Sequence, residues 1–125
     1  MIATAQTLES LLLNNVLDLR FVRRIPVPGK PNTRRMLCTK SSTLLNSPNG
    51  RMVLNYRPPT HPKKVNEARS NVSVVWDILM QDYRVVSADQ VNIIKSIPDN
   101  KEFWDYFNST IYVMTAEQKI QYMNS

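Results

Sequence analysis

The predicted fold rests on one stretch, Asn71-Val-Ser-Val-Val-Trp-Asp-Ile-Leu-Met-Gln-Asp-Tyr-Arg-Val-Val-Ser-Ala-Asp-Gln-Val-Asn-Ile-Ile-Lys-Ser-Ile97. From Val72 to Leu79 the side chains follow the two-residue period of a pleated strand. Two further β-rich runs, Tyr83–Val86 and Val91–Ile97, come after short polar breaks. Three short strands joined by short connections are typical of a meander, so we expect the core of a small antiparallel barrel or sheet.

Length and composition indicate a single globular domain, residues 1–125. The chain is 42% hydrophobic and has ten aromatic residues, which suits a protein with a core. Its two glycines, Gly29 and Gly50, are too few to suggest a phosphate-binding glycine loop. Cys38 has no partner for an internal disulfide, and the N-terminus does not resemble a signal peptide. Since no apolar run approaches the roughly 18 residues of a membrane span, we expect a reducing cytosolic setting and no membrane.

The net charge of +6 is unevenly distributed along the chain. Residues 16–69 hold twelve Lys/Arg against two acidic residues, whereas residues 70–125 hold four against seven. This asymmetry favours one basic face that meets a polyanion, with nucleic acid as the first candidate. A solvated basic surface without a polyanionic partner is the alternative.

The first part of the chain is expected to hold a helix and then a basic hairpin. Leucines at helical spacing predict a short helix within residues 1–15. Strands are predicted at Val16–Ile25 and Arg34–Thr39, on either side of a proline-rich loop. If these strands pair, five cations gather at the tip and outer face of the hairpin, namely Arg23, Arg24, Lys30, Arg34 and Arg35.

A basic insertion at about residues 46–70 is expected to interrupt the barrel. Before it, Ser41–Leu45 suits one serine-capped helical turn. Asn46–Gly50 predicts a turn, because Asn-Gly tolerates positive φ. Residues 57–64 are rich in proline and basic, which indicates an exposed extended loop.

The end of the chain, residues 98–125, is predicted to form a pair of short helices. Asp99 and Glu102 have the spacing of a capping box, and so do Thr115 and Gln118. The apolar faces of the two helices are expected to cover an open end or edge of a barrel formed by residues 16–97.

Five short segments form a recognisable order along the chain, namely Leu19–Arg24, Arg34–Thr39, Val74–Ile78 with its Val-Trp-Asp, Tyr83-Arg84, and Val91–Ile94. Together they resemble a family of small SH3-type β-barrel proteins of tailed bacteriophages. Family members tend to have a Trp-Arg-Ser-Phe-like strand after Val-Trp-Asp, whereas this chain has Tyr83-Arg84-Val85-Val86. The resemblance covers about half the chain and implies a fold and a viral origin. It brings no activity that can be assigned to named residues.

No catalytic, metal or cofactor site is predicted. His61 is a lone histidine in the proline-rich loop, and Cys38 sits in strand alternation as a small buried residue. Asp77 and Asp82 flank a turn and are expected to be a solvated hairpin end rather than a cation site. Four aromatic residues at strand or helical spacing are expected in the core rather than on a ligand, namely Trp76, Phe103, Trp104 and Phe107.

These observations lead to a mostly β (α+β) fold, a small SH3-like antiparallel barrel with an N-terminal helix and a C-terminal helical pair. The leading hypothesis is a non-enzymatic phage accessory protein in the host cytoplasm that binds DNA or RNA largely without sequence preference. The predicted contacts are Arg23, Arg24, Arg34, Arg35, Arg51, Arg57, Lys63, Lys64 and Tyr56. Tyr56 is included because an aromatic beside a cation suits an unpaired base, and Tyr83 is a second residue of this kind.

Two other functions remain open. The first is a protein-interaction module that binds a host protein of the transcription, nuclease or defence machinery, because SH3-like barrels do this through loops and edges. The second is a virion or assembly component, which would self-associate. The type of nucleic acid and the oligomeric state are also left open.

Overall fold

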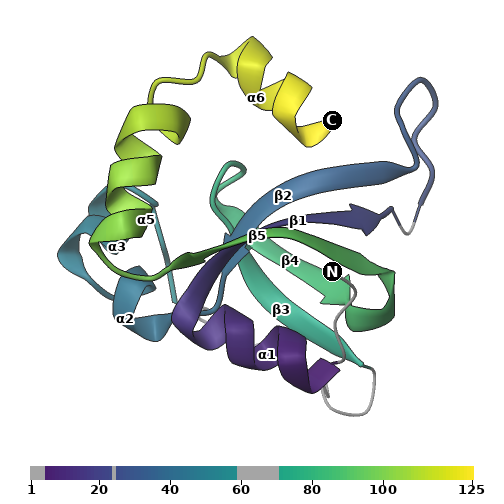
Figure 1. The fold of residues 1–125 in the computed structure, drawn as a ribbon. Coiled ribbons are helices and arrows are strands. Elements are labelled where there is room, and N and C mark those ends of the chain that lie inside the picture. The colour runs from purple at the N-terminus through teal and green to yellow at the C-terminus, as the bar shows by residue number, and fades with distance from the viewer. Residues whose placement is uncertain (1–4, 24, 59–70) are drawn as a thin grey trace.

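The computed structural model describes residues 5–23, 25–58 and 71–125, which form an α+β fold around one five-stranded antiparallel sheet (Figure 1). The strands are β1 (Asn15–Val22), β2 (Thr33–Thr39), β3 (Val72–Asp77), β4 (Asp82–Ser87) and β5 (Val91–Pro98). The helices are α1 (Ala5–Asn14), α2 (Ser42–Leu45), α3 (Pro48–Met52), α5 (Lys101–Tyr106) and α6 (Ala116–Met123), with a 3₁₀ turn η1 (Ala88–Gln90) and a π-helical turn η2 (Phe107–Ile111). The predicted strands and most of the predicted helices are therefore present, with ends that differ by up to three residues.

The strand order is β4-β3-β2-β1-β5, which corrects the expected meander. β3 and β4 form the predicted hairpin, with Trp76 opposite Tyr83. β5 does not continue from β4. It turns away at η1 and pairs with the far side of β1. The apolar run of β5 was visible in the sequence, but its partner depends on contacts between residues about 75 positions apart, which no local pattern encodes.

The sheet is open, since the edge strands β4 and β5 are not paired with each other. β2 and β3 pair only at Cys38↔Asp77 and Thr39↔Trp76, after which the two hairpins diverge. β1 and β2, by contrast, pair along their whole length and extend to one side of the molecule (Figure 1). This long hairpin carries the arginines that matter below.

The core lies on both faces of the curved sheet. On one face, Leu8 and Leu12 of α1 pack against inward residues of the strands, including the fully buried Cys38. On the other face, the short helices and the helical tail pack around Trp76 and Phe103. The expected core positions of Cys38, Trp76, Phe103 and Phe107 are confirmed, and Trp104 packs at the edge of the cluster around Trp76 and Phe103. The buried residues on this second face are Val16, Leu37, Leu44, Leu45, Leu54, Trp76, Ile78, Leu79, Ile97, Phe103, Phe107, Ile111 and Tyr122.

Gly50 serves a purpose other than the expected Asn-Gly turn. Gly50 is a buried residue of α3, and its backbone nitrogen donates a hydrogen bond to the hydroxyl of Ser47, the N-cap of that helix. A Cβ at Gly50 would lie 2.2 Å from the carbonyl oxygen of Leu44, so only glycine lets α2 and α3 approach this closely. Positive φ occurs instead at other residues, among them Asn55.

The two predicted capping boxes have different outcomes. Thr115 and Gln118 form the complete reciprocal box at the start of α6, as predicted. The cap of α5 is Asn100 rather than Asp99, and its side chain accepts from the backbone nitrogen of Glu102. Asp99 accepts a 2.6 Å hydrogen bond from the hydroxyl of Ser41 and so ties the start of the tail to α2.

Candidate nucleic-acid interface

Asp18 of β1 is a buried carboxylate that holds Arg35 of β2 in place. Its side chain is 2% exposed, and its two oxygens accept hydrogen bonds from Arg35 Nε at 2.8 Å and Nη2 at 2.6 Å. The hydroxyl of Tyr122 in α6 donates to Asp18 Oδ1 at 2.7 Å, and the Arg35 guanidinium lies over the Tyr122 ring. The hydrogen bond to Asp18 raises the pKa of Arg35, while burial raises the pKa of Tyr122. Much of the charge of Arg35 is therefore used inside the protein.

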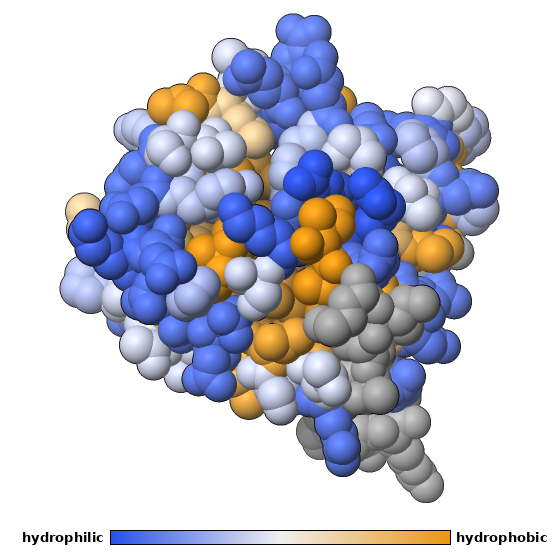
Figure 2. All heavy atoms as spheres, in the orientation of Figure 1, coloured by the Kyte–Doolittle hydropathy of each residue, from blue (hydrophilic) through white to orange (hydrophobic). Residues whose placement is uncertain are grey.

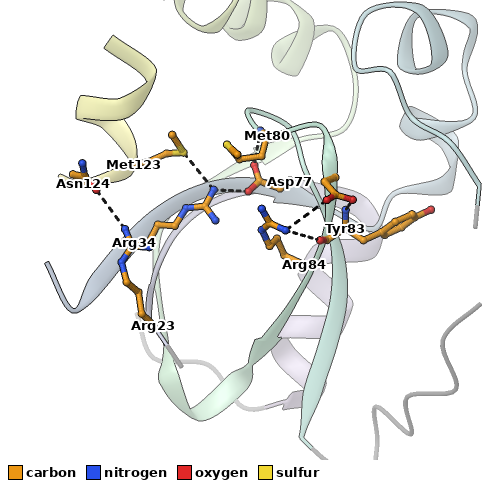
Figure 3. A network of polar contacts seen from close by, with 9 residues as sticks. Arg23, Arg34, Asp77, Met80, Tyr83, Arg84, Met123 and Asn124 are labelled. Carbon is orange, nitrogen blue, oxygen red and sulfur yellow. Dashed lines mark hydrogen bonds and ion pairs between the residues drawn. The ribbon is translucent and has the colours of Figure 1, made fainter. Parts of the chain in front are cut away.

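Arg34 is engaged in the same way with Asp77 at the end of β3. Nη2 of Arg34 lies 2.6 Å from Oδ2 of Asp77, and their side chains are 10% and 0% exposed. Figure 3 shows the Arg34 side chain between this carboxylate and Met123 of α6, where the same nitrogen lies 3.3 Å from the sulfur. The prediction of a solvated hairpin end at Asp77 is wrong, because Arg34 reaches across the gap where β2 and β3 diverge. Only Asp82, at 61% exposure, is in solvent.

Three other cations of the same hairpin have no such carboxylate. We use the name cationic end for the five residues Arg20, Arg23, Lys30, Arg34 and Arg35. Arg20 stands directly opposite Arg35 in the β1–β2 register, and Lys30 is exposed at the tip. Within the described ranges no ion pair joins Arg20, Arg23 or Lys30 to an acidic side chain. The cationic end thus contains two arginines that pair with buried carboxylates and three cations without an acidic side-chain partner among the described residues.

Arg51, Tyr56 and Arg57 form a second group beside β3 and β4. The Tyr56 ring meets Trp76 edge to face, with centroids 5.3 Å apart, and Arg51 lies over Tyr56 at 5.8 Å. The hydroxyl of Tyr83 contacts the Tyr56 hydroxyl at 3.1 Å and the carbonyl oxygen of Arg57 at 2.9 Å. Both tyrosines therefore fasten the segment after α3 to the sheet, and each is half-buried. Arg51 and Arg57 themselves are exposed.

The predicted contact residues do not all gather at one place. In Figure 1, α3, which carries Arg51, lies on the opposite side of the molecule from the β1–β2 hairpin tip. Arg23, Arg34 and Arg35 belong to the cationic end, of which two are internally paired. Arg24, Lys63, Lys64 and His61 lie outside the described residues.

Four residues of this region were not identified from the sequence: Asp18, Arg20, Arg84 and Tyr122. Asp18 could have been identified from the sequence, because a carboxylate between Leu17 and Leu19 in an apolar strand indicates a buried ion pair. Arg20 follows two residues later and so shares its strand face. Figure 3 shows Arg84 on β4 near the Arg34–Asp77 pair; its own carboxylate partner is Asp82, at 3.7 Å.

The described residues offer little to a small ligand or a metal. A hollow between β4 and the end of β1 measures about 30 Å³, whereas small-molecule pockets measure about 300–1,000 Å³. No group of three His, Cys, Asp or Glu residues that could hold a metal ion occurs in the described part of the chain. Burial raises the pKa of the Cys38 thiol, which opposes a nucleophilic role at neutral pH.

Comparison with protein-family models, curated proteins and solved structures finds no match for this chain. The structure itself defines an α+β protein with an open five-stranded antiparallel sheet. No helix in the described ranges has both the length and the apolar character needed to cross a bilayer.

Proposed function

We propose that this chain is a phage accessory protein that binds nucleic acid through its cationic end, without sequence preference and without catalysis. In this proposal the sheet is an open variant of an SH3-like barrel. The protein acts in the host cytoplasm. The proposal rests on the distribution of charge, and the resemblance to phage SH3-type proteins supplies the biological setting.

The observation that carries the proposal is a long acid-free segment. Residues 19–66 contain eleven Lys/Arg and no Asp or Glu. Asp18 and Asp77, which lie outside this segment, neutralise Arg35 and Arg34, and no acidic side chain among the described residues pairs with Arg20, Arg23 or Lys30. Such unpaired cations on a projecting hairpin suit phosphate oxygens, which accept charge-assisted hydrogen bonds from guanidinium groups.

The geometry suits contacts to the phosphate backbone rather than to base edges. No described helix presents a row of Asn, Gln and Arg side chains of the kind that reads the major groove. The face drawn in Figure 2 is mainly hydrophilic, with apolar residues gathered near its middle. Arg51 and Arg57 supply further phosphate contacts to a nucleic acid long enough to reach the second group.

The test replaces two cations that have no acidic side-chain partner among the described residues and leaves the internal ion pairs intact. Arg23→Gln with Lys30→Gln is expected to weaken binding of duplex DNA, measured by fluorescence anisotropy across a salt series. The log–log slope should become less steep by about 1.8, since each lost phosphate contact removes about 0.9. Lys101→Gln is the matched control, because Lys101 is 89% exposed on α5 and pairs only with Asp105. Equal affinities and slopes for the double variant and the control would refute the proposal.

A second candidate function is capture of a host protein. Tyr112 and Val113, between η2 and α6, are 72% and 64% exposed, and Ile120 of α6 is 53% exposed. Exposed aromatic and aliphatic side chains are enriched at protein interfaces. A pulldown from host lysate that resists nuclease would favour this candidate, and one that collapses with nuclease would favour nucleic acid. A third candidate, a virion or assembly component, requires stable oligomers in light scattering at high concentration.

A further inference from the structure

The end of α6 rests on the cationic end. Four arginines donate to three consecutive positions, Met123, Asn124 and Ser125, at the end of the helix. Arg34 Nη2 lies 3.3 Å from Met123 Sδ, and Arg23 Nη2 lies 3.4 Å from Asn124 Oδ1 (Figure 3). Arg20 Nε donates to the main-chain oxygen of Ser125 at 3.2 Å, and Arg35 Nη1 lies 3.4 Å from the hydroxyl of the same residue.

These bonds are 3.2–3.4 Å long, and their side-chain acceptors, a thioether sulfur, an amide oxygen and a hydroxyl, carry no full charge. Charge-assisted bonds from guanidinium to phosphate are shorter, about 2.7–2.9 Å, and roughly twice as strong as bonds between neutral groups. The last carbonyl groups of a helix do carry partial negative charge, which is why this end of α6 suits a cluster of arginines. A phosphate suits the same cluster better, so the two compete for the same donors.

α6 is attached to the rest of the protein by few groups. Tyr122 is the one residue of the helix that is buried. Its hydroxyl bonds to Asp18 and its ring lies under Arg35. Met114, before the helix, and Met123 are partly buried against the same core, whereas most other side chains of α6 are exposed, including Ile120. Elements with so few buried contacts open at low free-energy cost.

We propose that α6 is a displaceable lid over the cationic end, and that nucleic-acid binding and closure of α6 exclude each other. This inference rests on the proposed function and adds its regulation. With α6 closed, the donors of Arg20, Arg23 and Arg35 are partly occupied by Asn124 and Ser125. With α6 displaced, the same donors are available to successive phosphates, while Asp18 and Asp77 still hold Arg35 and Arg34 in the sheet.

The capping box at the start of α6 provides a test away from the arginines. The exposed Thr115 hydroxyl accepts from the backbone nitrogen of Gln118 at 3.1 Å, and the backbone nitrogen of Thr115 donates to Gln118 Oε1 at 2.9 Å. A detached helix of eight residues is not stable in water, so the cap contributes only while α6 is closed. Thr115→Ala should therefore weaken the closed form and raise affinity for a labelled oligothymidylate about fivefold, the equivalent of losing a typical N-cap.

Asn100→Ala is the matched control, because it removes the N-cap of a different short helix, α5, and leaves the capping box of α6 in place. Its affinity for the oligothymidylate should equal that of the unmodified protein. Hydrogen–deuterium exchange gives an independent readout on the unmodified chain, in which added oligothymidylate should speed exchange of the α6 amides. If the unmodified protein binds the oligothymidylate but Thr115→Ala binds it no more tightly than Asn100→Ala, the lid is refuted and the proposed function is not. Absence of binding by all three proteins at low salt would refute the proposed function and the lid together.

Discussion

Replacing Arg35 with methionine is expected to destabilise the fold far more than the same change at Arg20. Methionine keeps the apolar stem but removes both hydrogen bonds to Asp18, a carboxylate that is 2% exposed. Removal of one partner from a buried ion pair costs about 3–5 kcal/mol. Water offsets part of this cost because the Arg35 side chain is 26% exposed, and the Tyr122 hydroxyl still donates to Asp18. We therefore expect a loss of about 2–4 kcal/mol in the free energy of unfolding.

Urea unfolding followed by the fluorescence of Trp76 and Trp104 measures this loss. With a slope of about 2 kcal/mol per molar urea, a loss of about 3 kcal/mol lowers the midpoint by about 1.5 M. Arg20→Met is the control and should stay within about 0.5 kcal/mol of the unmodified protein, because the one hydrogen bond that its guanidinium makes within the described residues goes to the exposed Ser125. Equal midpoints for the two variants would refute the assignment of Arg35 as an internal charge.

The internal pairing of Arg34 and Arg35 limits which substitutions can test binding. Charge reversal at Arg34 and Arg35 is the experiment that the sequence suggests, because two adjacent arginines lie on a predicted basic hairpin. In the structure it would place a new carboxylate beside Asp77 and another beside Asp18, both buried. A loss of binding would then report unfolding, and for this reason the functional test uses Arg23 and Lys30.

Two further changes test the packing. Gly50→Ala should lower the urea midpoint, because the new Cβ would lie 2.2 Å from the carbonyl oxygen of Leu44 and overpacking costs about 1–3 kcal/mol; an unchanged midpoint would contradict the close approach of α2 and α3. Alkaline pH should also destabilise the fold, because burial raises the pKa of Tyr83 and of Tyr122, whereas an unfolded tyrosine ionises near pH 10. The stability from keeping these hydroxyls protonated is complete below about pH 10 and falls above it, by up to about 1.4 kcal/mol per pH unit for the buried Tyr122 and by less for the more exposed Tyr83. Tyr122→Phe should therefore show a shallower decline of midpoint with pH. An equal decline would contradict the burial of that hydroxyl.

Elements with a clear local signal were predictable. The alternation in Val72–Asp77, the leucine spacing of α1 and the Thr115–Gln118 capping box each depend on residues within a few positions of one another. The position of β5 was also predictable, but not its pairing with β1, because β5 could join either edge of the sheet. The openness of the sheet has the same origin, since closure depends on how two distant edges meet.

The cationic region was predictable as a composition and not as a surface. The sequence shows adjacent arginines at positions 34 and 35, but their environment depends on Asp18 across the β1–β2 register and on Asp77 across the gap to β3. Tyr122, 104 residues from Asp18, completes the first of these sites. Such partners are set by the tertiary fold, so charge patterning overstated the number of arginines that are available to a ligand.

The salt dependence of binding tests the central claim most directly. Fluorescence anisotropy of the unmodified protein with labelled duplex and single-stranded DNA, repeated across a salt series, reports the number of phosphates contacted. Contacts from Arg20, Arg23 and Lys30 alone predict a log–log slope of about −2.7 on duplex DNA, or about −2.1 on single strands, and further contacts make it steeper. Absence of binding at low salt, or a slope near zero, would contradict a cationic end that binds nucleic acid.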